Sequence, residues 1–226
     1  MRIMSFKKLG RAVRRVLGRP TSQDRLKAEI RRWRRDGGDE RLRHQFPLDA
    51  RSVVWDVGGF EGDFAAAVQE QYGCTVHLFE PVASFHARCE ERFRSVDRVA
   101  CHPYGLSDRN GHFDISLEDN ASSFHPAGQA ATVERAELRC VTEVFEALGL
   151  EWIDLIKMNI EGGEFEVLPA LLDSGLIRRV RHLMVQFHGF MPQAQARRDS
   201  IRARLAETHR EMWNYEFVWE SWELKA

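Results

Sequence analysis

The sequence predicts an α/β protein with a doubly wound, mostly parallel sheet and an antiparallel strand at its C-terminal end. Three observations support this prediction. Short apolar runs alternate with segments of helical length, a glycine-rich turn follows the first of these runs, and the last residues alternate aromatic with polar side chains. Strands that alternate with helices are typical of a parallel sheet covered by helices.

The first half of the predicted sheet contains three strands. SVVWDV (residues 52–57) is a continuous apolar run and indicates a buried strand, and the helix GDFAAAVQEQYG then ends at Gly73. The second strand, CTVHLFEP, ends at Glu80 and Pro81, and the helix SFHARCEERF follows it. RVACHPYGLSD is predicted to be a third strand that runs into a turn at residues 105–108.

The second half begins with short β segments and a loop, which we expect within residues 111–140. TEVFEALGL is a helix with Thr142 as its expected N-cap, and WIDLIKMNIEG is a buried strand. GEFEVLPALLDSG is a helix that ends at Gly175, VRHLMVQFHG is a strand, and residues 192–209 form a helix. The tail NYEFVWESWEL is expected to be the antiparallel strand.

The composition is that of a soluble globular protein. Of the 226 residues, 43% are hydrophobic and 30% are charged, and no apolar run approaches the ~18 residues that a membrane-spanning helix needs. The four cysteines show neither a CxxC pair nor the spacing of metal ligands. We therefore expect free thiols in a reducing compartment and a cytoplasmic location.

Charge is distributed unevenly along the chain. Residues 1–44 hold 15 Lys and Arg against 5 Asp and Glu. The whole chain has 33 basic and 34 acidic residues, so residues 45–226 hold 18 basic and 29 acidic residues. The chain is thus predicted to have a basic helical N-terminal extension, residues 1–44, and an acidic domain, residues 45–226.

The extension permits two interpretations. Its apolar residues recur near helical spacing between basic residues, and the stretch EIRRWRRDGG continues this pattern until Gly37 and Gly38 end the helix. Such a helix packs on its own domain or on a second subunit. Alternatively, residues 1–35 lie on an anionic membrane surface or bind another polyanion, which would make the protein peripheral to the membrane.

Polar residues gather at the predicted carboxyl ends of the strands. Asp56, Glu80, the 105–108 turn, residues 159–161 and His188 all occupy such positions. Ligands of doubly wound sheets bind beyond these strand ends, so we expect one site there.

The segment VVWDVGGFEGDF indicates which ligand this site takes. A dinucleotide-binding GxGxxG motif would need glycine at position 57, which is Val, and Asp56 would repel a pyrophosphate. A cofactor with an amine and a sulfonium, such as S-adenosylmethionine, suits an acid at this position. Glu80, 24 residues after Asp56, stands where a carboxylate accepts hydrogen bonds from ribose hydroxyls.

Four segments, VVWDVGGFEGDF, VHLFEP, GLSD and IDLIKMNIEGGEFEVL, resemble the FkbM family of methyltransferases over residues 50–190. The resemblance implies a Rossmann-like class I methyltransferase fold and methyl transfer from S-adenosylmethionine to a hydroxyl of a sugar, glycan, glycolipid or related natural product. It implies that the cofactor lies against the first two strand ends and that the 105–108 turn lies near the adenine. The predicted cofactor-binding residues are Asp56, Gly58, Gly59, Phe60, Gly62, Glu80, Pro81, Gly105, Leu106 and Ser107.

The resemblance also implies that Lys157, Asn159 and Glu161 face the acceptor. The chain departs from the family where Asn159 replaces the usual Asp and where Phe60 stands in a loop that usually reads G-A-N-x-G. A sugar hydroxyl benefits from a general base, for which His188 is our first candidate and Glu161 the second.

Several roles at this site stay open. Lys157 orients the acceptor, pairs with Glu161, or forms an internal ion pair at a strand end. A divalent ion held by Asn159, Glu161 and His188 is conceivable but not predicted, because carboxylates are few. NASSF, residues 120–124, is either a polar flap over the acceptor or an ordinary loop.

Three other functions are weighed against methyl transfer to a hydroxyl. A nicotinamide-dependent oxidoreductase would be favoured by a Tyr three residues before Lys157, but position 154 is Asp. An RNA-directed methyltransferase would use the basic extension, although the domain itself is acidic. A non-catalytic interaction module would bind no cofactor. The acceptor, the position methylated, the metal dependence and the oligomeric state are left open.

Overall fold

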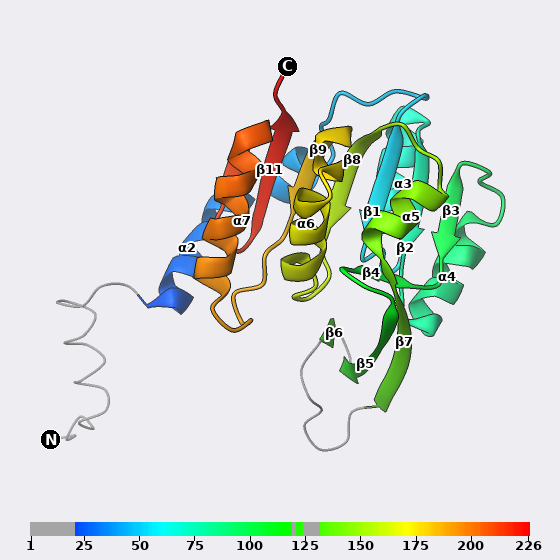
Figure 1. The fold of residues 1–226 in the computed structure, drawn as a ribbon, viewed down its shortest axis with the longest axis horizontal. Helices are drawn as coiled ribbons and strands as arrows, with labels where there is room; N and C mark the ends of the chain where they lie inside the picture. Colours follow the sequence, from blue (N-terminus) through cyan, green and yellow to red (C-terminus); the bar gives the residue numbers. More distant parts are fainter. Residues whose placement is uncertain (1–20, 119–120, 124–131) are drawn as a thin grey trace, which may run out of the picture.

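The computed structural model describes residues 21–118, 121–123 and 132–226 of the chain. The first part of the basic extension and both ends of the NASSF segment lie outside the described residues. Within them, a seven-stranded sheet forms the centre of the molecule, with the strand order β10-β11-β9-β8-β1-β2-β3 (Figure 1). The strands are β1 (Val53–Val57), β2 (Thr75–Phe79), β3 (Val99–His102), β8 (Ile153–Met158), β9 (Val180–Val185), β10 (His209–Tyr215) and β11 (Trp219–Leu224).

The sheet is mostly parallel. β1 pairs in parallel with β2 and with β8, and β3 and β9 extend the parallel sheet on either side. β11 runs antiparallel to both β9 and β10. This arrangement confirms the predicted doubly wound α/β class with an antiparallel strand at the C-terminal end.

Helices cover both faces of the sheet, because successive strand residues point to opposite sides. Trp55 packs into a core with side chains of α5, α6 and α7, whereas Val54 packs into a second core with α2, α3 and α4. The helices are α2 (Ser22–Arg35), α3 (Asp63–Tyr72), α4 (Ala83–Phe93), α5 (Val141–Ala147), α6 (Glu164–Asp173) and α7 (Ala194–Thr208), with a π-helical turn η1 (Gly38–Leu42) and a 3₁₀ turn η2 (Leu176–Arg179).

A second, four-stranded sheet extends away from the first (Figure 1). Its strands, in the spatial order β4-β7-β5-β6, are β4 (Gly105–Ser107), β5 (Gly111–Glu118), β6 (Ala121–Ser123) and β7 (Thr132–Cys140). The turn expected at residues 105–108 is therefore largely a strand, because Gly105 to Ser107 pair in parallel with residues 138–140 of β7. Because β7 is far from β4 in sequence, no local pattern near residues 105–108 indicates this pairing.

Two further local predictions are wrong. Thr142 does not cap α5, which begins at Val141 after Cys140, and no side-chain cap bond forms there. The C-terminal tail is not one strand but the β10–β11 hairpin, with its turn at residues 216–218. The alternation of aromatic side chains continues across that turn, so the pattern alone did not reveal it.

The described part of the N-terminal extension packs on the domain. Trp33 is 3% exposed and lies against the rings of Trp213 and Tyr215 on β10, with centroid separations of 5.5 and 5.1 Å. Tyr215 also donates a hydrogen bond of 3.0 Å to the Asp36 carboxylate. The interpretation of a helix packed on its own domain therefore holds for α2.

None of the helices in the described residues is both long and apolar enough to cross a membrane. All four cysteines have free thiols, two of them buried and two partly buried.

Candidate active site

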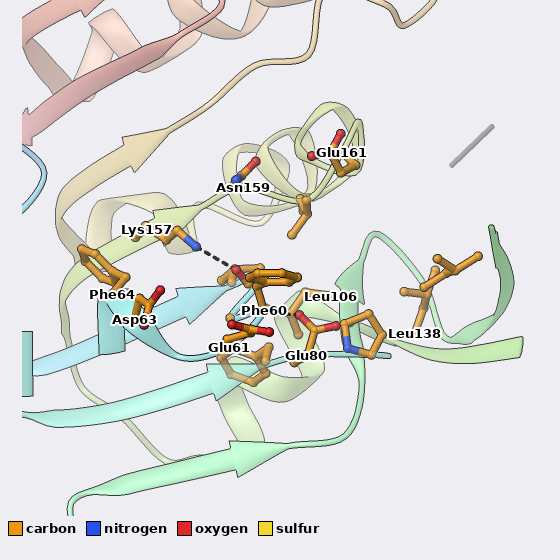
Figure 2. Close-up of a pocket in the computed structure, with 18 of the residues that line it drawn as sticks. Phe60, Glu61, Asp63, Phe64, Glu80, Leu106, Leu138, Lys157, Asn159 and Glu161 are labelled. Carbon is orange, nitrogen blue, oxygen red and sulfur yellow. Dashed lines mark hydrogen bonds between the residues drawn. The ribbon is translucent and has the colours of Figure 1, made fainter. Parts of the chain in front are cut away.

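A cavity of about 330 Å³ opens at the carboxyl ends of β1, β2 and β8 (Figure 2). It is bounded by the loop after β1, the residues after β2 and β8, and residues of β4, β5 and β7 in the second sheet. Its lining residues are Arg43, Val57, Gly58, Gly59, Phe60, Glu61, Asp63, Phe64, Phe79, Glu80, Pro81, Gly105, Leu106, Ile115, Leu138, Lys157, Asn159, Ile160 and Glu161.

The loop after β1 needs glycine for steric reasons. Gly58 has a φ of +82°, and a Cβ atom there would lie 2.0 Å from the carbonyl oxygen of Asn159. The amides of Gly58 and Gly59 both donate to the carbonyl of Phe79, at 3.0 and 3.1 Å. The loop is thus clamped between the ends of β2 and β8, and at Gly58 and Gly59 it presents backbone to the cavity.

Asp56 occupies the strand tip, but its charge is not free. Its Oδ1 accepts a hydrogen bond of 2.8 Å from Lys157 Nζ, and its side chain has no exposed area. Asp56 and Lys157 are register partners on adjacent parallel strands, so their side chains emerge on the same face. From the sequence we expected a negatively charged strand tip that suits a cationic ligand. The structure corrects this expectation, because a lysine from β8 neutralises the acid.

Glu80 directs a carboxylate toward the middle of the cavity (Figure 2). Its two oxygens accept backbone N–H bonds from Phe60 and Val82, at 2.8 and 2.9 Å. Burial raises the pKa of Glu80 to about 7, although both N–H bonds favour the charged form. The carboxylate is therefore fixed in orientation while further lone pairs remain for a ligand.

Asn159 and Glu161 lie on the wall above Glu80 in Figure 2. Asn159 Oδ1 is buried without a hydrogen-bond partner among the described residues. Glu161 has a φ of +49°, a left-handed conformation that costs free energy in any residue but glycine. Strained backbone and an unpaired buried acceptor are typical of functional sites.

His188 lies behind Glu161 and does not line the cavity. Its Nε2 is 3.4 Å from Glu161 Oε1, and its Nδ1 is 3.1 Å from Oε1 of Glu164, a carboxylate with no exposed area. Burial lowers the pKa of His188, but the hydrogen bonds to Glu161 and Glu164 outweigh that effect and raise it to about 9. An imidazolium has no lone pair to accept a proton, so the geometry favours Glu161 over His188 as a base.

Most of the predicted residues share this one cavity. Those that line it are Gly58, Gly59, Phe60, Glu80, Pro81, Gly105, Leu106, Lys157, Asn159 and Glu161. Asp56, Gly62, Ser107 and His188 do not. Gly62 precedes α3 with a φ of +79°, and Ser107 donates a hydrogen bond of 2.9 Å to Glu166.

Sequence reasoning missed several residues. Arg43 comes from the turn before the domain, and Leu138 and Ile115 come from the second sheet, so no local pattern ties them to the motif. Glu164, at the start of α6, binds the His188 ring and backbone N–H, and no local pattern indicates this contact. Asp63 and Phe64 directly follow the glycine loop, and their place at the start of a helix was the available signal.

The site fits S-adenosylmethionine. The cavity offers apolar walls for an adenine ring, the fixed carboxylate of Glu80 for ribose hydroxyls, and backbone at Gly58 and Gly59 for close approach. Among the residues that the structure describes, no group of three or more His, Cys, Asp or Glu is arranged to hold a metal ion.

The model of the Methyltransferase FkbM domain matches residues 56–218. The chain belongs to the FkbM methyltransferase family. This membership confirms the resemblance, the class I methyltransferase fold and, for this domain, S-adenosylmethionine as the methyl donor.

Two curated proteins are similar to parts of this FkbM chain. The 2-O-methyltransferase NoeI of Sinorhizobium fredii is 26% identical over 137 residues, which cover 52% of this chain and 56% of NoeI. The AMB antimetabolite synthetase AmbE of Pseudomonas aeruginosa is 27% identical over 204 residues, covering 72% of this chain and 10% of AmbE. The chain thus spans about half the length of the first relative and a tenth of the second.

Among solved structures, the FkbM domain is similar to the S-adenosylhomocysteine-bound methyltransferase PaMTH1 of Podospora anserina. The TM-score is 0.48 at 12% identity, over 100% of this chain and 99% of that chain.

Proposed function

We propose that this protein is an O-methyltransferase that transfers a methyl group from S-adenosylmethionine to a hydroxyl of a sugar, glycan, glycolipid or related natural product. The observation that carries the proposal is the carboxylate of Glu161, which lines the cavity in a strained conformation and has an unpaired amide oxygen, Asn159 Oδ1, nearby. The name of one relative, a 2-O-methyltransferase, supports transfer to oxygen.

The residues of the chain have separate tasks in this proposal. Bound cofactor supplies an electrophilic methyl carbon on a positively charged sulfur. Glu161 accepts the proton of the acceptor hydroxyl and, being 29% exposed, releases it to solvent. His188 positions Glu161 through its Nε2, and Asn159 Oδ1 accepts a hydrogen bond from the acceptor. Since methyl transfer is an in-line displacement, this positioning supplies much of the rate.

The direct test is to incubate the protein with methyl-labelled cofactor and a panel of glycans, glycolipids and RNA, and to locate the label by mass spectrometry. We expect the label on a carbohydrate or natural-product oxygen. Label on RNA, or S-adenosylhomocysteine binding without transfer to any hydroxyl, would overturn the proposal.

A matched pair of variants then tests the role of Glu161. Glu161→Gln should lower kcat roughly 10²- to 10⁴-fold while leaving the affinity for S-adenosylhomocysteine unchanged. Glu151→Gln, at an exposed position before β8, is the control and should leave kcat unchanged. Equal activity of Glu161→Gln and wild type would remove Glu161 from the mechanism.

We also propose a cytoplasmic location with peripheral contact to anionic membranes through residues 1–35. Exposed basic residues of α2, namely Lys27, Arg31 and Arg34, support this proposal. Replacing these three by Glu should weaken sedimentation of the protein with phosphatidylserine vesicles at low salt. Equal sedimentation of variant and wild type would remove α2 from the membrane proposal.

A further inference from the structure

Arg43 reaches the cavity from outside the matched FkbM region, which begins at residue 56. It directly follows the π-helical turn η1, and its backbone N–H donates to the Gly38 carbonyl at 3.0 Å. The next residue, His44, has its ring 6.0 Å from that of Phe64, which lines the cavity. The turn is thereby held against one end of the site.

The guanidinium of Arg43 is only partly satisfied by the protein. Nη1 is 3.2 Å from Asp39 Oδ1, and the Cζ atom lies 5.2 Å from the ring centroid of Trp219. Nε is buried and has no hydrogen-bond partner among the described residues. The Arg43 side chain nevertheless lines the cavity and is 27% exposed, so an anionic ligand in the cavity can reach its charge.

The cavity has two chemically different ends. In Figure 2 Leu138 lies at one end, Phe64 and Lys157 lie at the other, and Glu80 lies between them. Two cations line the cavity, Arg43 and Lys157. Lys157 already donates to Asp56 and to the Gly58 carbonyl, at 2.8 and 2.7 Å. Arg43, whose side chain is 27% exposed against 5% for Lys157, is therefore the lining cation that an anionic ligand can reach more easily.

We propose that Arg43 binds the carboxylate of the methionine part of S-adenosylmethionine. The proposal rests on the proposed function, and it places the adenosine part toward Glu80 and the apolar end of the cavity. A guanidinium suits a carboxylate because its N–H groups form charge-assisted hydrogen bonds in a planar fork. A carboxylate on the acceptor would have the same chemistry, and the experiment separates the two sources.

The test is isothermal titration calorimetry with two ligands. S-adenosylhomocysteine carries the amino-acid part, whereas 5′-methylthioadenosine keeps the adenosine and thioether but lacks it. Arg43→Ala should weaken S-adenosylhomocysteine binding 10- to 100-fold and leave 5′-methylthioadenosine binding unchanged. Arg43→Lys, which keeps the charge without the fork, should fall between wild type and Arg43→Ala.

Arg41→Ala is the matched control. Arg41 belongs to the same turn, is exposed, and uses its guanidinium to bind the Asp36 carbonyl at 2.9 Å, so its loss should not change the affinity for either ligand. If Arg43→Ala lowers the affinity for both ligands equally, the proposal is overturned, because such a change would reflect a disturbed cavity.

Unchanged S-adenosylhomocysteine affinity in both Arg43 variants would also overturn it, and a raised acceptor KM in that case would assign Arg43 to the acceptor instead. Failure of the wild-type protein to bind S-adenosylhomocysteine would overturn this proposal and the proposed function together. If the wild-type protein binds S-adenosylhomocysteine and both Arg43 variants bind it with the same affinity, only the role of Arg43 is overturned.

Discussion

Lys157 joins the two central strands at their carboxyl ends. Its Nζ lies 2.8 Å from Asp56 Oδ1 and 2.7 Å from the carbonyl oxygen of Gly58, and the side chains of Lys157 and Asp56 are 5% and 0% exposed. One buried cation therefore holds β1, β8 and the start of the glycine loop in one arrangement. The shape of the cavity depends on this pair, although Asp56 does not line it.

Removing Lys157 should be strongly destabilising. Lys157→Met leaves the Asp56 charge buried without its partner, and we expect the free energy of unfolding in urea to fall by roughly 3–5 kcal/mol. The double variant Asp56→Asn, Lys157→Met should recover much of this loss, because no buried charge is left unpaired.

Arg181→Met is the control for that pair. It breaks the Arg181–Asp154 ion pair, in which Arg181 is 55% exposed, and should cost less than about 1 kcal/mol. A similar small cost for Lys157→Met would show that the buried pair does not hold the strands together.

A methyl group at Gly58 should not be tolerated. Gly58→Ala combines a φ of +82° with a Cβ position 2.0 Å from the Asn159 carbonyl, and we expect a loss of roughly 2–5 kcal/mol in stability. Gly149→Ala, at a φ of +62° with nothing within 4 Å, separates the conformational cost from the clash and should lose about 1–2 kcal/mol. If urea unfolding shows the same loss of stability for Gly58→Ala and Gly149→Ala, the clash with the Asn159 carbonyl does not contribute.

The histidines should titrate far apart in NMR spectra. His188, between two carboxylates, should show a midpoint near pH 9. His102 should titrate near pH 4, because burial and the neighbouring His77, 3.1 Å away, both lower its pKa. Glu164→Gln should shift the His188 midpoint downward, and an unshifted midpoint would exclude the Glu164 contact.

The charge of His188 also makes stability depend on pH. The pKa of His188 is raised from 6.5 to about 9 by folding, so its contribution is fully present below pH 6.5 and is lost as the pH rises through 9. The loss should be roughly 3 kcal/mol in urea unfolding. His188→Gln should remove that dependence, and a variant with the same dependence as wild type would contradict the assignment.

Glu80 should couple pH to both stability and cofactor binding. Its pKa is raised from 4.5 to about 7, so its contribution to stability is present below pH 4.5 and decreases by roughly 3 kcal/mol as the pH rises through 7. Ribose hydroxyls donate to the charged carboxylate, so S-adenosylhomocysteine affinity should rise over the same interval.

Glu80→Gln separates these effects. The variant should unfold with a flatter pH profile than wild type between pH 4.5 and 7. It should also bind S-adenosylhomocysteine weakly at every pH, and unchanged affinity in calorimetry would remove Glu80 from the cofactor site.

Much of the fold could be predicted because its signals are local. The buried run before Gly58, the glycine loop and the position of Glu80 after a second strand depend on residues close in sequence, and the structure places the loop and Glu80 together. The second sheet was predicted only coarsely. β4 pairs with a strand more than 30 residues away, and nothing in Gly105 to Ser107 encodes that partner.

The sequence by itself determined the alternation of strands and helices, the loop that only glycine can form at position 58, and the gathering of polar residues at the strand ends. These features follow from side-chain periodicity and backbone sterics, which act over a few residues. The tertiary structure alone decided that Lys157 neutralises Asp56 across 101 positions, that Glu164 and Glu161 enclose His188, and that Arg43 enters the cavity. Such neighbours depend on strand order and packing, and these bring together residues between which the chain carries no local signal.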